Sequence, residues 1–197
     1  IDRSRGLGDV YKRQPQWYTV AHRSRAYVNK VLSSISGEYY KNYKINSIKR
    51  ISSGIQVYYG GDNEFFDYDK VILATHANEA LALIKNPTEK EKNILSNFGY
   101  RENNAVLHFD ESMMPKNKKT WSSWNSFVDP KNLNKSSLSY WLNLLQNLKI
   151  EKNIFLTLNP FRDIDKKKIL KKIKFTHPYY DQKALDNQKN LKNIQNI

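Results

Sequence analysis

The chain has 197 residues, a formal net charge of +14, a hydrophobic fraction of 39% and no cysteine. This length and apolar content suit one packed domain or slightly more, and they exclude wholesale disorder. The lack of cysteine excludes disulfides, thiolate metal sites and cysteine nucleophiles and agrees with a cytoplasmic location, and no apolar run approaches the about 20 residues of a transmembrane segment.

A first helix is predicted over residues 24–37. Ser24 can cap its start and Gly37 can end it. Its apolar residues recur at helical spacing, and they are Tyr27, Val28, Val31, Leu32 and Ile35. Because these residues share one face, we expect the helix to pack against another element.

A β-meander is predicted over residues 43–69, where apolar residues alternate and glycine-containing turns separate three strands. "KVILAT", residues 70–75, is apolar almost throughout, which is typical of a strand covered on both faces in a parallel α/β sheet. A helix over residues 76–84 follows directly. Thr75 and His76 therefore lie at the carboxyl end of a buried strand, where α/β folds bind ligands.

The second half of the chain is predicted to contain one more helix and then an antiparallel sheet. Thr88 and Glu91 have the spacing of a capping box, and Gly99 is expected to end that helix. Alternating residues predict strands over residues 104–110, 153–160 and 173–181. A helix over residues 182–197 is expected to close the chain.

The densest basic cluster is "DKKKILKKIKF", residues 165–175, where Ile169, Leu170 and Ile173 recur at helical intervals. This pattern predicts a small amphipathic helix with a solvated lysine face. The alternative is a patch that binds nucleic acid or an anionic membrane. The aromatic residues are scattered along the sequence rather than interleaved for base stacking, so no specific nucleic-acid partner is expected.

No dinucleotide-binding Gly-x-Gly-x-x-Gly, P-loop, Gly-x-Ser-x-Gly or His-Glu-x-x-His pattern occurs in the chain. The four histidines are far apart, so no metal site is expected. His76 can be either a neighbour of a helix cap or a residue at a cofactor. His108 is expected on the wetter face of its strand, and His177 is expected to shape a turn before a proline.

Aromatic and amide residues cluster in the two predicted segments around the third and fourth tryptophans. These residues are Trp124, Asn125, Tyr140 and Trp141. One interpretation is an aromatic wall around a small-molecule substrate. The other is core packing in which each indole N–H finds a hydrogen-bond partner.

A series of segments resembles the flavin-containing amine-oxidase-like proteins, in particular the bacterial predicted NAD/FAD-binding proteins. In order they are "WYTV…SRAYV", "DKVILATHANEALALI", "NAVLHFDESMMP", "WSSWN", "YWLNLLQNL", "FLTLNP" and "THPYYD". The resemblance runs from about Trp17 to the C-terminus. It implies an α+β, two-domain FAD-dependent oxidoreductase that transfers hydride from an amine or an acyl-type substrate to flavin.

The resemblance also implies a domain plan. Residues 15–84 correspond to part of the FAD-binding domain, residues 85–180 to the substrate domain, and residues 181–197 to a helix that leads back to the FAD-binding domain. The glycine-rich FAD segments of the family have no counterpart here, so we expect an internal fragment that neither binds FAD nor acts as an enzyme alone. The oligomeric state is not assigned.

Within this plan, Ile48 corresponds to the strand that passes the adenine end of FAD. Ala74, Thr75 and His76 correspond to the turn near the flavin. The family's glycine pair before the meander is replaced here by "AHRSR", and no catalytic base is assigned. The alternative function is a basic module that binds nucleic acid or an anionic membrane.

Residues 1–14 stand apart from this resemblance. "DVYKRQ", residues 9–14, can be encoded by GATGTGTATAAGAGACAG, which resembles the end sequence of a transposon adapter used in DNA sequencing. We therefore expect residues 1–14 to be translated adapter rather than part of the fold.

Overall fold

The computed structural model describes residues 18–61 and 64–195 and combines short helices with two antiparallel sheets, so the α+β class is confirmed. In chain order the elements are α2 (Arg23–Ser33), β1 (Ile45–Ile51), β2 (Gly54–Tyr59), β3 (Phe65–Tyr68), α3 (Ala77–Leu83), α4 (Glu89–Leu95), β4 (Gly99–His108), η1 (Glu111–Met113), η2 (Lys118–Thr120), β5 (Trp124–Asp129), β6 (Asn132–Trp141), α5 (Leu142–Leu145), β7 (Phe155–Leu158), η3 (Lys166–Lys168), β8 (Ile169–Tyr179), α6 (Gln182–Gln188) and η4 (Leu191–Ile194). The adapter prediction for residues 1–14 lies outside the described residues.

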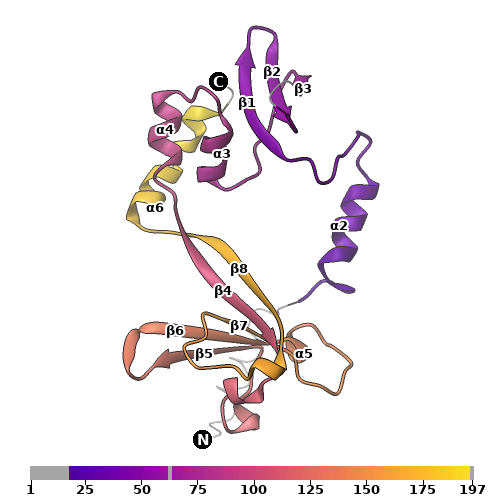
Figure 1. Cartoon of the computed structure of the whole chain (residues 1–197), viewed down its shortest axis with the longest axis vertical. Coiled ribbons are helices and arrows are strands. Elements are labelled where there is room, and N and C mark those ends of the chain that lie inside the picture. The colour runs from indigo at the N-terminus through magenta and orange to yellow at the C-terminus, as the bar shows by residue number, and fades with distance from the viewer. Residues whose placement is uncertain (1–17, 62–63, 196–197) are drawn as a thin grey trace, which may run out of the picture.

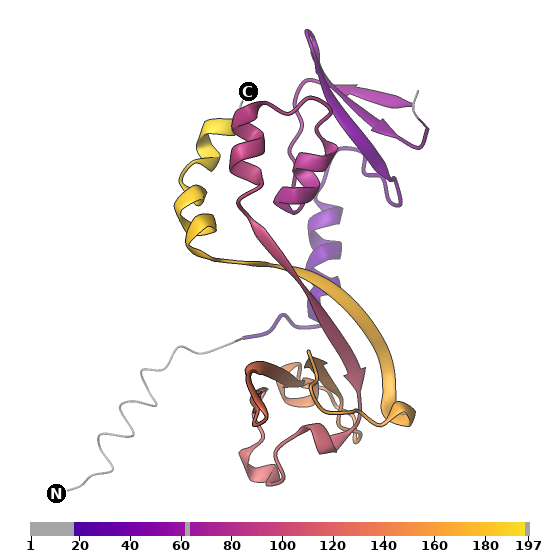
Figure 2. The same ribbon diagram turned by 60° about the vertical axis from the view of Figure 1, so that its left-hand side comes forward.

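Two bodies are joined by a long pair of strands. One body holds the three-stranded sheet β1-β2-β3 with α3, α4, α6 and η4, and the other holds most of the five-stranded sheet β5-β6-β7-β4-β8. The antiparallel pair of β4 and β8 runs from one body to the other, as Figures 1 and 2 show. No helix among the described residues is both long and apolar enough to cross a membrane.

The predicted meander is present in the first body. A tight turn joins β1 to β2, and at its end Gly54 has a φ of 149°, where an added Cβ would collide with the carbonyl of Tyr68. Only glycine therefore suits this position. The core of this body is built from Ile48, Ile84 and Leu95.

The capping box predicted for α4 is confirmed. The backbone N–H of Glu91 donates to Thr88 Oγ1 at 3.2 Å, and the backbone N–H of Thr88 donates to Glu91 Oε2 at 2.8 Å. The helix ends at Leu95, and Gly99 begins β4 instead of ending the helix. The predicted closing helix is also interrupted, because it forms α6 and the separate 3₁₀ turn η4.

The buried strand predicted over residues 70–75 is not formed. This segment forms no strand, and Ile72 is 92% exposed. A strand needs a neighbour to pair with its N–H and C=O groups, and no described strand pairs with this segment. The apolar composition of residues 70–75 therefore predicted a strand that does not form among the described residues.

The first helix, α2, differs from the prediction at both ends and on its apolar face. It follows a left-handed His22 (φ 61°) rather than a Ser24 cap, and it ends at Ser33, before Gly37. None of its residues is buried, and Val31 remains 54% exposed. The expectation that its apolar face packs on another element is therefore wrong for the described part of the chain.

The lysine-rich helix predicted over residues 165–175 is also wrong. This region forms η3 and the first part of β8, which pairs along the whole length of β4. Ile169 and Ile173 are four residues apart, a spacing that a regular strand allows as well as a helix. In β8 they lie on opposite faces, because a register shift pairs Ile169 with His108 while Ile173 pairs with Ala105. Pairing with β4 decides between helix and strand.

Candidate functional site

Ile48, the predicted adenine contact, packs in the core and forms a backbone hydrogen bond within the first body. Its side chain is 9% exposed within the core of the first body. Its carbonyl accepts a hydrogen bond from Lys85 N–H at 2.9 Å, beside a parallel bridge between Ile48 and Ile84. Both the side chain and the carbonyl of Ile48 therefore serve the contact between β1 and the end of α3.

His76 is the N-cap residue of α3, and exposed Ala74 and Thr75 precede it. The His76 backbone N–H donates to Glu79 Oε2 at 3.2 Å. The His76 ring stacks on Tyr100 with ring centroids 4.6 Å apart, and Tyr100 Oη accepts the Ala77 N–H at 2.6 Å. These contacts fit the interpretation of His76 as a residue at a helix cap.

A cleft of about 1020 Å³, lined by both apolar and charged side chains, opens between β1, residues 69–73, α3, α4 and η4. Ile48 and Leu73 line it, and the Arg50–Glu91 ion pair lies at its wall. Burial raises the pKa of Glu91, but hydrogen bonds from Arg50 and Thr88 outweigh this effect and lower it. The structure thus brings Ile48 and the approach to residues 74–76 to one cleft.

The N-terminus of α3 does not fit the pyrophosphate of FAD. A phosphate site needs free N–H groups at a helix N-terminus and favours the absence of acidic groups there. At α3 the N–H groups of His76 and Ala77 are already bonded, and Glu79 adds a negative charge in the first turn. These residues supply no phosphate-binding loop.

The four predicted substrate residues lie in the five-stranded sheet, but on opposite faces. Trp124 pairs with Tyr140, and Asn125 pairs with Ser139. Residues paired across two strands share a face, and successive residues along one strand lie on opposite faces. Trp124 and Tyr140 therefore lie on one face. Asn125 and Trp141 lie on the other, so the four do not form one wall.

The face that carries Asn125 and Trp141 is the buried one. Asn125 is 7% exposed, and its side-chain amide bonds both Ser122 and the carbonyl of Ser139. Trp141 Nε1 donates to Asn153 Oδ1 at 2.9 Å. These contacts agree with the packing interpretation for these two residues.

A chain of polar side chains runs through this buried face. His108 Nε2 lies 2.8 Å from Thr157 Oγ1, which lies 2.8 Å from Ser139 Oγ, and all three residues are 0% exposed. The Asp110 backbone N–H donates to His108 Nδ1 at 3.1 Å, so Nε2 carries the hydrogen of the neutral ring. Burial lowers the pKa of His108 to about 4. The expectation that His108 lies on a wetter face is wrong.

His177 also differs from its prediction. It lies within β8 rather than in a turn, opposite Arg101 of β4. Its Nδ1 atom is 3.1 Å from Asn103 Nδ2. The proline that follows, Pro178, is tolerated because β8 is the last strand of the sheet.

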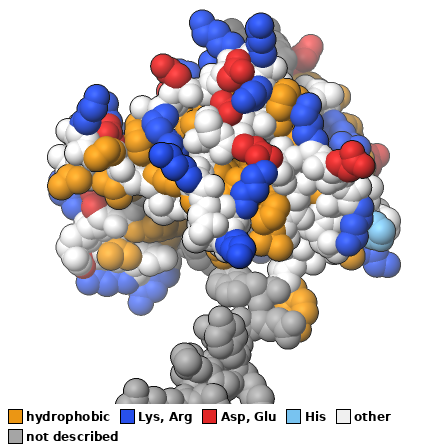
Figure 3. Space-filling view, turned by 90° about the horizontal axis from the view of Figure 1, so that it is seen from below, with side chains coloured by type: hydrophobic (Ala, Val, Ile, Leu, Met, Phe, Trp, Pro, Cys, Tyr) orange, Lys and Arg blue, Asp and Glu red, His pale blue; other side chains and the backbone are white. Residues whose placement is uncertain are grey.

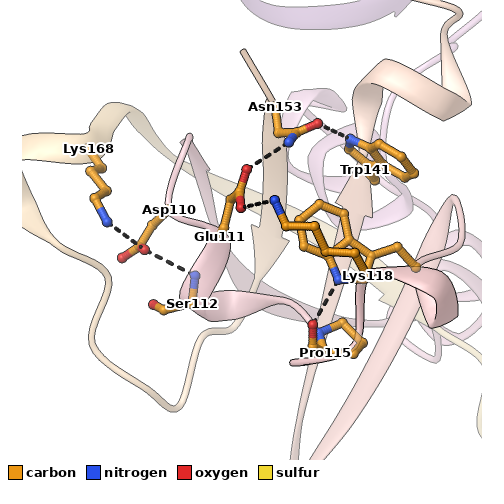
Figure 4. A network of polar contacts seen from close by, with 9 residues as sticks. Asp110, Glu111, Ser112, Pro115, Lys118, Trp141, Asn153 and Lys168 are labelled. Atoms are coloured by element: carbon orange, nitrogen blue, oxygen red, sulfur yellow. Dashed lines mark hydrogen bonds and ion pairs between the residues drawn. The ribbon is translucent and has the colours of Figure 1, made fainter. Parts of the chain in front are cut away.

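Ionic contacts hold a loop over the buried face, as Figure 4 shows. Asp110 is 2% exposed and bonds Lys168 Nζ at 3.1 Å. Burial raises the pKa of Asp110, but the N–H groups of Asp165 and Ser112 and the Lys168 ammonium outweigh it and lower it to about 2. Nearby, Glu111 bonds Lys118 and Asn153, each at 2.7 Å. This network anchors η1 and η2 over the sheet.

The opposite face of the sheet is apolar and half-exposed. One line of paired residues crosses all five strands, and we call it the transverse row: Lys171, Leu107, Leu156, Tyr140 and Trp124. A parallel line, the second row, consists of Ile173, Ala105, Leu158, Leu138 and Ser126. Neither row contains an acidic residue. Figure 3 views the molecule from the end that carries this sheet, where hydrophobic side chains reach the surface between lysines and arginines.

The leucines of the two rows were not among the predicted substrate residues. Their signal was the alternation over residues 154–158, which separated Leu156 and Leu158 from Phe155 and Thr157. The alternation does not tell which set is inside. The structure buries the set with Phe155 and Thr157, both 0% exposed, and leaves the leucines only partly buried.

No family model matches the chain, and no curated protein matches it. The fold is similar to that of a solved structure, the CLA-producing fatty acid isomerase from P. acnes, with a TM-score of 0.50 and 12% sequence identity. The similarity covers 91% of this chain and 44% of that chain. The chain thus has the fold of one part of the isomerase and spans less than half of its length.

Proposed function

We propose that this chain is part of an FAD-dependent oxidoreductase and that the five-stranded sheet faces an acyl-type substrate. Two independent findings support the proposal: the ordered motifs that resemble flavin-containing amine-oxidase-like proteins, and a fold similar to that of a fatty acid isomerase. The observation that carries the choice of substrate is the apolar face formed by the two rows.

The composition of this face favours an acyl chain over an amine. A cationic amine is bound by carboxylates or by a cage of aromatic rings. The two rows contain no carboxylate, and only Trp124 and Tyr140 are aromatic. The middle of the face is made of aliphatic side chains, which are suited to hydrocarbon.

The cofactor is not assigned to described residues of this chain. The N-terminus of α3 has its first N–H groups bonded and an acidic first turn. We therefore derive no step through flavin and assign no catalytic base. The role proposed for the chain is to bind and orient the substrate.

The alternative function, a basic module for nucleic acid or an anionic membrane, loses its main support. The lysines expected on one helical face are divided between the two faces of β8, because Lys171 and Lys172 are neighbours in a strand. Lys168 and Lys174 are paired with Asp110 and Glu102. The region therefore presents no single lysine face.

The reading frame around the coding sequence in unamplified source DNA tests this proposal. We expect a Gly-x-Gly-x-x-Gly loop within about 200 residues upstream, on the scale of one domain. The encoded full-length protein should then purify with bound flavin. If the frame encodes no such loop, or if the full-length protein is colourless and takes up no FAD, the proposed function is wrong.

A further inference from the structure

The transverse row has the shape of an extended binding surface. Its residues occupy adjacent strands, and neighbouring strands are about 4.8 Å apart, so the row spans about 19 Å from Lys171 to Trp124. An acyl chain in a membrane fills half of the hydrocarbon core, about 15 Å. The row is therefore long enough for one long-chain acyl group.

The second row runs beside the transverse row on the same face, and we call the two rows together the two-row surface. In the second row β4 contributes Ala105, which is two residues before Leu107 of the transverse row and lies on the same face. The small side chain of Ala105 lies between Ile173 and Leu158, which are its partners on the neighbouring strands. Ala105 itself is only 1% exposed, so the accessible part of this line is formed by its partly exposed aliphatic neighbours.

The two ends of the transverse row differ in chemistry. At one end Lys171 carries a positive charge and forms no ion pair with another described residue, whereas Lys168 and Lys174 on the same strand region are paired. At the other end lies the indole of Trp124, which is 47% exposed. The centre, formed by Leu107, Leu156 and Tyr140, contains no formal charge.

We propose that the two-row surface binds a long-chain fatty acid across the strands, with the carboxylate at Lys171 and the hydrocarbon tail toward Trp124. The proposal rests on the acyl-substrate part of the proposed function and adds the position and direction of the ligand. A carboxylate complements the unpaired ammonium, and the aliphatic centre removes hydrocarbon from water.

Oleate binding to the 197-residue chain, measured by isothermal titration calorimetry without FAD, tests the proposal. Lys171→Met removes the carboxylate partner and should weaken oleate binding about fivefold, while leaving methyl oleate unaffected. Lys172→Met is the matched control, because Lys172 is the next residue of β8 and lies on the opposite face. It should leave both affinities unchanged.

A second pair of variants tests the hydrocarbon part of the two-row surface. Leu156→Asp places a charge in the middle of the transverse row and should weaken both ligands at least about tenfold. Leu133→Asp makes the same change on β6 at a side chain that is 80% exposed and outside both rows. Circular dichroism confirms that each variant is folded, and Leu138→Ser is the milder substitute if Leu156→Asp is not.

The outcomes separate the two proposals. Equal losses in Lys171→Met and Lys172→Met, or an unchanged affinity in the folded variants of the two-row surface, would overturn the placement of the ligand. No oleate binding by the unaltered chain would overturn it as well. These measurements use no flavin, so they leave the FAD part of the proposed function to its own test on the full-length protein.

Discussion

His108 Nε2 donates a hydrogen bond to Thr157 Oγ1 over 2.8 Å, between two side chains that are completely buried on neighbouring strands. With Ser139 they form a line of buried polar side chains on the inner face of the five-stranded sheet, beside the buried Phe155 and Val106, while the leucines of the two rows lie on its half-exposed face. Leucines on the half-exposed face depart from the usual pattern for a sheet with one covered face. A buried histidine makes stability sensitive to pH, and an apolar exterior is suited to a ligand or partner.

The first prediction concerns the stability of the chain in mild acid. The pKa of His108 is lowered from 6.5 to about 4, so the unfolded state takes up a proton first as the pH falls. The contribution of neutral His108 to the free energy of unfolding is therefore complete above pH 6.5. It declines by about 3 kcal/mol in total as the pH falls to 4. Urea unfolding of the chain at a series of pH values measures this decline.

His108→Gln is the control for that experiment, because glutamine keeps a polar side chain but does not titrate. The variant should be less stable near neutral pH and should lose most of the decline between pH 6.5 and 4. Asp110 contributes separately. Its pKa is lowered from 3.8 to about 2, so the stability that it contributes is lost only as the pH falls below about 3.8. An identical pH dependence in both proteins would contradict the assignment to His108.

The second prediction compares two acidic residues of the network that anchors η1 and η2. Asp110→Asn removes a buried carboxylate that bonds Lys168 and two backbone N–H groups, so it should cost about 2 kcal/mol. Glu111→Gln changes a side chain that is 43% exposed, so it should cost less than about 1 kcal/mol. Chemical denaturation gives both free energies, and equal costs would show that burial does not dominate this network.

The third prediction concerns the extended segment 70–75. Its apolar, unpaired backbone is a template for intermolecular strand pairing, and Ile72 is 92% exposed. Ile72→Lys should reduce self-association, as measured by light scattering, without lowering the unfolding midpoint. Leu133→Lys, at an 80% exposed position of β6, is the matched control and should reduce self-association less. A larger effect at Leu133 would place the aggregating edge elsewhere.

The fourth prediction is that the 197-residue chain purifies without flavin. The first N–H groups of α3 are bonded to Glu79 and Tyr100, and the sequence has no dinucleotide-binding glycine loop. Added FAD should elute separately from the protein in gel filtration, and visible absorbance should not follow the protein peak. A stoichiometric yellow complex would mean that the described residues, or those around them, do form a flavin site.

Local patterns in the sequence were enough to predict several elements. The meander of β1, β2 and β3, the start of α4 at the Thr88–Glu91 capping box, and the strand around Phe155 all follow from features within a few residues. A capping box closes its own hydrogen bonds, and strict alternation identifies a strand without reference to its neighbours.

Other features depended on partners that are distant along the chain. Ile169 and Ile173 have a spacing that suits a helix or a strand equally. Pairing with β4, a strand that ends at His108, decides between the two. The segment 70–75 has the composition of a buried strand, but no described strand pairs with it.

The sequence by itself determined which residues of β7 share a face, because side chains alternate along every strand. Only the tertiary structure decided which face is inside. The loop anchored by Asp110 and Lys168 covers the side of Phe155 and Thr157, so the polar groups there find their partners in one another. The side of Leu156 and Leu158 is left for hydrocarbon, because burial depends on which distant segment reaches a face and not on the order of residues along the strand.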